Sequence, residues 1–265
     1  MSFLYETHLH TARGSACGIS MGPEYVQRYI DLGYQGIIVT EHFFNGNSAV
    51  DRRLPWREWV NRFCRGYEET WEEGQRRGLD VFFGWEETFD GCDDYLVYGL
   101  DKAWLLEHPE SRKWTRGGQY RAVKDAGGCV VQAHPFRQHD YIRKIVLSSG
   151  CVDAVEAANA GNHEQSYDAL AMRYAARTGL AAAAGSDTHD LSRLDEKNAY
   201  GVYLEKKMES IACYVKAVKE HAIAGIKTEP GRCDYRGDEY VRLPVDIRDG
   251  GDRSTGRDLW EFLNG

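Results

Sequence analysis

The sequence predicts a parallel β/α barrel, and three observations lead to this prediction. Short apolar or alanine-rich runs alternate with longer amphipathic stretches along most of the chain. Histidine, glutamate or aspartate repeatedly follows or ends such a run, and 265 residues suffice for one large domain. In a parallel barrel the carboxyl ends of the strands meet on one face, where the chemistry takes place. A doubly wound open sheet is the main alternative, but the chain lacks the glycine-rich phosphate loop of such folds.

The first predicted strand is the segment 5–10, in which His8 and His10 flank the apolar Leu9. Later strands are expected at short β-branched, aromatic or alanine-rich runs, namely 36–40, 79–86, 94–99, 129–134, 152–157, 180–185 and 200–204. The run at 36–40 is uniformly apolar, which is typical of a strand buried on both faces.

Helices are expected between these strands. The first begins at Pro23 and ends before Gly33, because proline suits a first helical turn and glycine suits a helix end. Further helices are predicted at 56–77, 102–106, 118–126, 163–177 and 210–222. The helix at 56–77 carries an aromatic stripe that we expect in the core, formed by Trp59, Phe63, Tyr67 and Trp71. From Thr228 onward the chain has little periodicity and is expected to be irregular.

The pair His8 and His10 is built like half of a metal site, because side chains two apart on a strand point to the same face. One exposed and one hydrogen-bonded histidine is the alternative interpretation. A metal site is favoured by the groups that end the later runs, Thr40-Glu41-His42, Gly84-Trp85-Glu86, Ala133-His134-Pro135 and Gly185-Ser186-Asp187-Thr188-His189. Imidazole and carboxylate ligands suit zinc, manganese or iron, and a carboxylate can bridge two ions. Two such ions can promote phosphoryl transfer.

Composition narrows the classes of partner and compartment. The formal net charge of −8 and a pI of about 5.6 argue against nucleic acid, although a local basic patch would remain compatible with them. Seven cysteines without a Cys-x-x-Cys pair indicate reduced thiols. The first residues lack the pattern of a secretory leader, and no run approaches the roughly 20 apolar residues of a membrane span. We therefore expect a soluble, cytoplasmic protein with a small-molecule partner and no contact with membranes.

Six motifs occur in a fixed order along the chain: His8-x-His10, Thr40-Glu41-His42, Gly84-x-Glu86, Ala133-His134-Pro135-Phe136-Arg137, Glu156-x-x-Asn159 and Gly185-Ser186-Asp187-x-His189. As a set they resemble the PHP (polymerase and histidinol phosphatase) family of metal-dependent phosphoesterases over roughly residues 1–205. The resemblance implies a distorted (β/α)7 TIM-like barrel of the PHP type. We assign residues 1–227 to this barrel and residues 228–265 to an irregular C-terminal extension packed on it.

The resemblance also implies two or three divalent metal ions at the carboxyl face, with zinc, manganese and iron as the candidates. The implied ligands are His8, His10, His42, Glu86, His134, Asp187 and His189. One ion would be held by His8, His10, Glu86 and Asp187. The glutamate would bridge to a second ion, which His134 also binds, while His42 and His189 would hold a third where one is present.

The chain departs from the family pattern at three positions. A histidine often found on the fourth strand, where it completes the ligands of the second ion, is missing near Leu96. Cys17 falls close to a loop position where some members supply a ligand to the third ion, although a buried or inert thiol is the alternative. Glu41 stands where aspartate is usual before the histidine.

The expected reaction is hydrolysis of a phosphomonoester by metal-activated hydroxide. Arg137 is expected to bind a phosphoryl oxygen through its planar fork, with a surface salt bridge as the alternative. His189 or His42 would protonate the leaving oxygen where metal leaves one of them free. Arg13 is a second candidate contact with substrate, and Asn159 would bind substrate hydroxyls or, like Glu156, orient the metal ligands.

Three other functions are compatible with parts of the pattern. An amidohydrolase also starts with His-x-His, but it usually adds a lysine at a strand end, and none follows the strands ending at Glu86, Gly99 or His134. A phosphodiesterase or exonuclease is disfavoured by the acidic balance. A non-catalytic metal-binding or regulatory domain would fit if Leu96 has emptied the second metal site.

Overall fold

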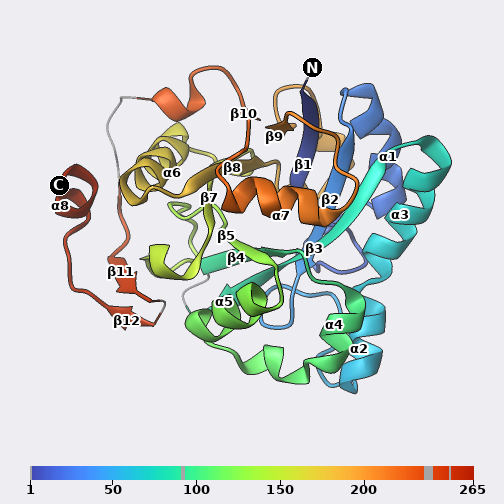
Figure 1. The fold of residues 1–265 in the computed structure, drawn as a ribbon, viewed down its shortest axis with the longest axis horizontal. Coiled ribbons are helices and arrows are strands. Elements are labelled where there is room, and N and C mark those ends of the chain that lie inside the picture. The colour runs from blue at the N-terminus through green and yellow to red at the C-terminus, as the bar shows by residue number, and fades with distance from the viewer. Residues whose placement is uncertain (1, 91–92, 236–240, 251) are drawn as a thin grey trace.

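The computed structural model describes residues 2–90, 93–235, 241–250 and 252–265. Its main sheet has nine strands in the order β10-β9-β1-β2-β3-β4-β5-β7-β8 (Figure 1). The bounds are β1 Phe3–Leu9, β2 Gly36–His42, β3 Asp80–Phe89, β4 Asp93–Tyr98, β5 Cys129–Gln132, β7 Ala154–Asn159, β8 Ala181–Gly185, β9 Gly201–Leu204 and β10 Gly225–Lys227. All strands predicted from the sequence are present within a few residues of their expected bounds.

The sheet curls into a nearly closed barrel because the chain after β8 returns to β1. The amide of Asp187 donates to the carbonyl of His8 at 2.8 Å, and the amide of His10 donates to the carbonyl of Thr188 at 3.0 Å. These bonds join the carboxyl end of β1 to the segment that follows β8. Strand β9 pairs antiparallel with the amino half of β1. The strands β1 to β5, β7 and β8 therefore form the barrel wall, as expected. Strand β9 also pairs with β1, so the barrel is not regular there.

One barrel strand runs against the predicted parallel direction. Strand β4 is antiparallel to both β3 and β5, with Leu96 opposite Glu86 on one side and Val131 on the other. The amino end of β4 therefore lies on the same barrel face as the carboxyl ends of its neighbours.

The helices lie outside the sheet, at α1 Gly22–Asp31, α2 Trp56–Phe63, α3 Arg65–Arg77, α4 Lys102–Glu107, α5 Arg116–Asp125, α6 Gln165–Thr178 and α7 Ile211–Lys219. The predicted helix at 56–77 is two helices that meet at Cys64. Trp59 and Phe63 are fully buried as expected, but Trp71 is 43% exposed because it lies on the second helix, where it faces solvent. No helix in the described ranges is long and apolar enough to span a bilayer.

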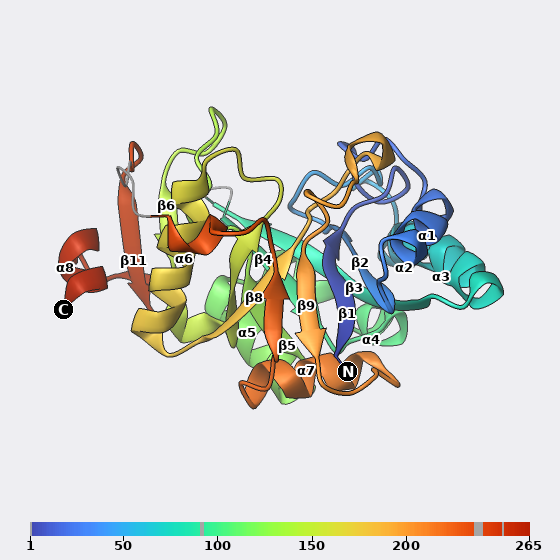
Figure 2. The same ribbon diagram turned by 90° about the horizontal axis from the view of Figure 1, so that it is seen from above.

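The barrel interior is apolar at the end opposite the carboxyl face. Leu96 and Tyr98 of β4 pack there against Tyr214 and Val218 of α7, which closes that end (Figure 2). The ring of Tyr214 meets the ring of Tyr98 edge-on at 4.9 Å. Burial of these side chains fixes the lower half of the barrel and leaves its upper half for polar groups.

The expectation of an irregular extension after residue 227 is wrong for its described part. Strand β11 (Val245–Asp249) pairs in parallel with β6 (Ile145–Leu147), a short strand that the sequence did not predict, and antiparallel with β12 (Arg253–Ser254). Helix α8 (Leu259–Asn264) packs Phe262 against Tyr174 of α6, with 6.1 Å between ring centroids. This small sheet and helix lie beyond α6, at the far side from α1 and α3 (Figures 1 and 2).

Candidate metal centre

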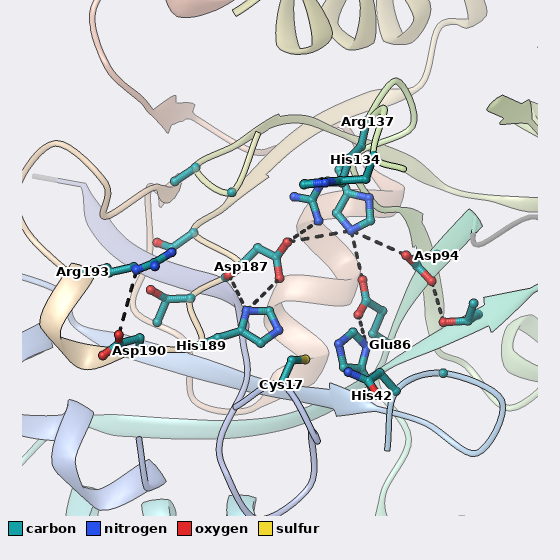
Figure 3. A pocket seen from close by; sticks show the side chains of 18 of the residues that line it. Cys17, His42, Glu86, Asp94, His134, Arg137, Asp187, His189, Asp190 and Arg193 are labelled. Atoms are coloured by element: carbon teal, nitrogen blue, oxygen red, sulfur yellow. Dashed lines mark hydrogen bonds and ion pairs between the residues drawn. The ribbon is translucent and has the colours of Figure 1, made fainter. Parts of the chain in front are cut away.

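The strand ends gather the predicted metal ligands around one cavity of about 880 Å³ (Figure 3). His42, Glu86, His134, Asp187 and His189 line it. His8 and His10 are fully buried and lie directly behind these residues, within 3.5 Å of Glu86 or Asp187. Seven side chains from five strand ends thus meet at one place, as a barrel requires.

The hydrogen bonds of His10 decide which of its nitrogens can bind a metal. Its Nδ1 lies 2.9 Å from Oγ of Ser15, and that hydroxyl donates its only proton to Oε2 of Glu41 at 2.7 Å. Nδ1 of His10 must therefore be the donor to Ser15, which leaves a lone pair on Nε2. Glu41 is anchored in turn by the amide of Thr11 at 3.0 Å. This glutamate, singled out in the sequence, orients a ligand from behind.

His8 is oriented in the same way by Glu156. Its Nδ1 lies 2.9 Å from Oε1 of that carboxylate, which accepts the proton. Nε2 of His8 then faces Nε2 of His10 at 3.0 Å, so that a proton or a metal ion has to lie between the two nitrogens. Burial lowers the pKa of His8, but Asp187, Glu156 and Glu86 outweigh it and hold the pKa well above its usual range. The surroundings of Nε2 therefore favour a positive charge.

The atoms around this position have the spacing of a metal's ligands. Nε2 of His8 lies 3.3 Å from Oε1 of Glu86 and 3.4 Å from Oδ1 of Asp187. Nε2 of His10 lies 3.5 Å from Oε2 of Glu86 and 3.2 Å from Oδ1 of Asp187. Ligands of tetrahedral zinc at its usual bond lengths are separated by about 3.3 Å. The four residues implied for the first ion therefore fit one.

A second group of donors includes a residue that the sequence analysis did not assign. Nε2 of His134 lies 3.2 Å from Oε1 of Glu86 and 3.8 Å from Oδ2 of Asp94, and the three residues form a candidate metal group. Asp94 is the second residue of β4, and Thr88 donates to its other oxygen at 2.5 Å. Leu96, near which the family resemblance implies a ligand, lies deeper in the barrel, among apolar side chains. Asp94 thus supplies a donor from β4 that Leu96 cannot supply.

The third group combines His10, His42 and His189, whose ligand atoms lie within 4.8 Å of one another. Nδ1 of His42 lies 2.7 Å from Oε2 of Glu86, yet neither atom makes a well-oriented hydrogen bond within the described part of the chain. Buried polar atoms without a partner are costly, so this pair also suits a cation. Nδ1 of His189 donates to the carbonyl of Asp187 at 2.9 Å, which turns Nε2 toward the cavity.

Cys17 lines the cavity beside these histidines and is exposed, so it is not the buried thiol considered as the alternative. Burial raises the pKa of this thiol, but hydrogen bonds to His189 and His42 outweigh the effect and lower the pKa to about 6. A thiolate at this position could act as an additional ligand.

The two carboxylates shared between the groups are held as anions. Burial raises the pKa of Glu86, but His8 and His42 outweigh it and place the pKa well below its usual range. For Asp187 burial is likewise outweighed by His8 and Arg137. Two of the predicted ligands also adopt backbone conformations that non-glycine residues rarely take, with φ of 27° at His134 and 51° at Asp187. Such strain is characteristic of functional sites.

Arg137 is held at the cavity by three acceptors. Its Nη1 lies 2.7 Å from Oδ2 of Asp187, its Nη2 donates to Oδ1 of Asn159 at 2.7 Å, and its Nε donates to Oδ1 of Asn162 at 3.0 Å. Gly161 completes this arrangement, because a Cβ there would lie 2.9 Å from Nη2 of Arg137. The alternative of a surface salt bridge does not describe this side chain, which is only 11% exposed and lines the cavity.

Two predicted contacts with substrate are placed elsewhere. Arg13 does not line the cavity, and its half-exposed side chain pairs with Glu69 of α3 at 3.0 Å. Asn159 is fully buried, and both ends of its side-chain amide are hydrogen-bonded. Its Oδ1 accepts from Arg137, and its Nδ2 donates to Oε2 of Glu156 at 2.8 Å. Arg13 is therefore no longer a candidate, and Asn159 orients other residues. His163, on the loop after β7, lines the cavity.

No protein-family model matches the chain, and no curated protein matches it. Solved structures do share its fold. A Bifidobacterium adolescentis protein, described as a candidate metal-dependent phosphoesterase, aligns with a TM-score of 0.51 and 16% identity over 72% of this chain and 89% of its own length. A two-domain Bacteroides vulgatus protein, described as containing a predicted PHP-like metal-dependent phosphoesterase, has a TM-score of 0.57 and 15% identity over 86% of this chain.

The lesion-specific endonuclease PfuEndoQ of Pyrococcus furiosus aligns with a TM-score of 0.53 and 12% identity over 86% of this chain. The chain spans 65% of the length of the Bacteroides protein and 57% of that of the endonuclease. At these identities the likeness concerns the fold, and it confirms the expected PHP-type barrel. Because one of the three structures is an endonuclease, the fold gives no support to the expectation that nucleic acid is not a partner.

Proposed function

We propose that this chain is a metal-dependent phosphoric ester hydrolase that cleaves a phosphomonoester of a small molecule. The observation that carries the proposal is the approach of two imidazole nitrogens, those of His8 and His10, to 3.0 Å between the carboxylates of Glu86 and Asp187. Burying two carboxylates and two imidazoles this close together is costly unless a cation lies between them. Bound divalent ions supply Lewis-acid activation of water and neutralise phosphoryl oxygens.

The chain offers places for two or three ions. His8, His10, Glu86 and Asp187 would hold the first, and His134 with Asp94 would hold the second beside the shared carboxylates. His42 and His189 would hold the third, because the one free nitrogen of His10 faces the first ion. The nitrogen, oxygen and sulfur donors suit zinc, manganese or iron.

Arg137 binds the phosphoryl group in this proposal. Its guanidinium has five N–H groups, of which contacts with Asp187, Asn159 and Asn162 use three. It therefore keeps donors for a phosphate oxygen in the cavity that it lines. Because Asp187 touches both His10 and Arg137, the phosphate is held directly beside the metal ligands.

A proton for the leaving oxygen comes from His189 or His42, when the nitrogen that faces the cavity is not bound to metal. His189 is the better placed of the two. It is 25% exposed, and its Nδ1 is committed to the carbonyl of Asp187. Its Nε2 is therefore the atom that can carry the proton.

The charges of the lining favour a small ester over a polymer. The cavity is lined by two arginines, Arg137 and Arg193, and by no lysine from the described residues. A nucleic-acid groove needs more cations to contact successive phosphates. The lack of a lysine also disfavours an amidohydrolase, and Asp94 weakens the case for an empty second site and a non-catalytic role.

The test is turnover of phenyl phosphate and of diphenyl phosphate by manganese- or zinc-loaded protein. We expect the monoester to be hydrolysed and the diester to react at least tenfold more slowly. Replacing Arg137 by glutamine should raise KM for the monoester by roughly 10- to 100-fold, since an interaction between two charged groups is lost. Faster hydrolysis of the diester, or an unchanged KM in Arg137→Gln, would contradict the proposal.

A further inference from the structure

Three aromatic rings stand together at one side of the cavity and have no part in metal binding. His139 and Tyr141 lie on the loop that follows Arg137, and His163 lies on the loop after β7. The rings of His139 and Tyr141 are nearly parallel, with an interplanar angle of 11° and centroids 5.2 Å apart. His163 meets His139 edge-on at 5.1 Å. We call these three residues the aromatic wall.

The aromatic wall does not belong to the packed interior. None of its residues is part of a described hydrophobic cluster, and Tyr141 is 59% exposed although its ring is large. Burial lowers the pKa of His139, and so do the charges of Arg137 and His163, which keeps the imidazole neutral and suited to stacking. Exposed rings that are ordered against each other at a cavity offer a flat apolar surface to a ligand.

The position of the wall relates it to the phosphate. Arg137 is only two residues before His139, and its guanidinium is fixed by Asp187, Asn159 and Asn162. The guanidinium and the three rings line the same cavity, so one molecule can place its phosphate on Arg137 and a ring on the aromatic wall. The cavity of about 880 Å³ has room for a group much larger than phosphate.

We propose that the aromatic wall binds the leaving group of the substrate, and that this group carries a planar aromatic ring. The inference rests on the proposed phosphomonoester hydrolysis and names its substrate class. Aryl phosphates and nucleoside monophosphates share the required chemistry, which is a flat ring within reach of a phosphate.

Binding of unreactive analogues tests the wall apart from catalysis. Calorimetric titration of manganese-loaded protein with phenylphosphonate and methylphosphonate compares one phosphoryl group with and without a ring. We expect the phenyl compound to bind about tenfold more tightly, as stacking on an aromatic side chain provides. Tyr141→Leu should remove most of this preference, and Tyr141→Phe should keep it. Equal affinity for both compounds, or a full preference in Tyr141→Leu, would overturn the inference.

Turnover then separates the two substrate sources. Values of kcat/KM are compared for phenyl phosphate, adenosine 5′-monophosphate and glycerol 3-phosphate. A preference for either aromatic ester supports the wall and identifies the source, whereas a preference for glycerol 3-phosphate contradicts it. Tight phenylphosphonate binding without any turnover would remove the proposed function and leave the wall as a binding site. Turnover together with equal affinities for the two phosphonates would support the proposed function and contradict the role of the aromatic wall.

Discussion

Asp94 Oδ2 lies 3.8 Å from Nε2 of His134, although Asp94 is near the start of a strand and His134 follows one. The two meet because β4 runs antiparallel to β5, so that its first residues reach the face where β5 ends. Burial raises the pKa of Asp94 well above its usual range, and the charge of Glu86 adds to this shift. A carboxylate in such surroundings is stabilised by a bound cation.

We therefore expect Asp94→Asn to lose about one metal ion per chain, because a neutral amide is a weak ligand for divalent zinc or manganese. Asp94→His should keep the ion, since imidazole would replace the carboxylate with the ligand implied by the family resemblance. Elemental analysis of gel-filtered protein measures both variants. Full metal content in Asp94→Asn would remove this residue from the site.

The direction of β4 explains why the sequence analysis missed Asp94. A parallel barrel puts the polar groups at carboxyl strand ends, and the family resemblance puts the fourth-strand ligand near Leu96, which lies deeper in the barrel. The short gap between the predicted strands 79–86 and 94–99 was the available signal, because a parallel crossover needs a dozen residues or more. His8, Glu86 and Asp187 were predictable because their strands follow the parallel rule.

Arg232 connects the chain after residue 227 to the cavity. Its Nε donates to Oδ2 of Asp168 at 2.5 Å, and Asp168 accepts from the Nδ2 of Asn162 at 2.6 Å. Asn162 in turn accepts from Arg137. Arg232→Met should raise KM by roughly tenfold with kcat and metal content unchanged, because it loosens a group that binds substrate. Steady-state kinetics with phenyl phosphate measure this split.

A double variant separates this positioning role from stability. Arg232→Met alone leaves Asp168 buried without its partner and should lower the free energy of unfolding by about 3 kcal/mol. Adding Asp168→Asn removes the buried charge and should restore stability, measured by urea unfolding, while KM stays raised. If KM returned to the wild-type value in the double variant together with the stability, Arg232 would not position Arg137.

Glu87 makes stability depend on pH. Burial raises its pKa to about 8, against 4.5 in the unfolded chain. The protonated form is favoured in the fold, so this stabilising contribution is complete below pH 4.5 and is lost as pH rises to about 8. Glu87→Gln should match the wild type near pH 5 and be more stable at pH 9, by on the order of 2 kcal/mol. Urea unfolding at both pH values checks this, with the exposed Glu72→Gln as control.

Cys17 should be protected from alkylation when the third group of ligands is occupied. The thiol is exposed, so a reagent can reach it in the metal-free protein. Hydrogen bonds to His189 and His42 lower its pKa to about 6, which favours the reactive thiolate. Peptide mapping after iodoacetamide treatment should find Cys17 modified at least tenfold more slowly in zinc-loaded protein. Cys213, away from the cavity, serves as the internal control. Equal rates with and without zinc would place Cys17 outside the metal centre.

The chain after residue 227 was the least predictable part of the fold. Strand β11 is short, and its partner β6 has three residues, so neither has the length from which alternation can be recognised. Their pairing depends on contacts with α6, where Ile247 and Leu147 join one hydrophobic cluster. Such structure is set by tertiary packing rather than by local pattern.

Metal content measured together with hydrolysis tests the central claim most directly. We expect purified wild-type protein to hold more than one divalent ion per chain and to hydrolyse phenyl phosphate. His8→Ala and Asp187→Ala should lose both properties, while His221→Asn, at an exposed position outside the cavity, should keep both. One ion or none, with no turnover of mono- or diesters after loading with manganese or zinc, would contradict the account.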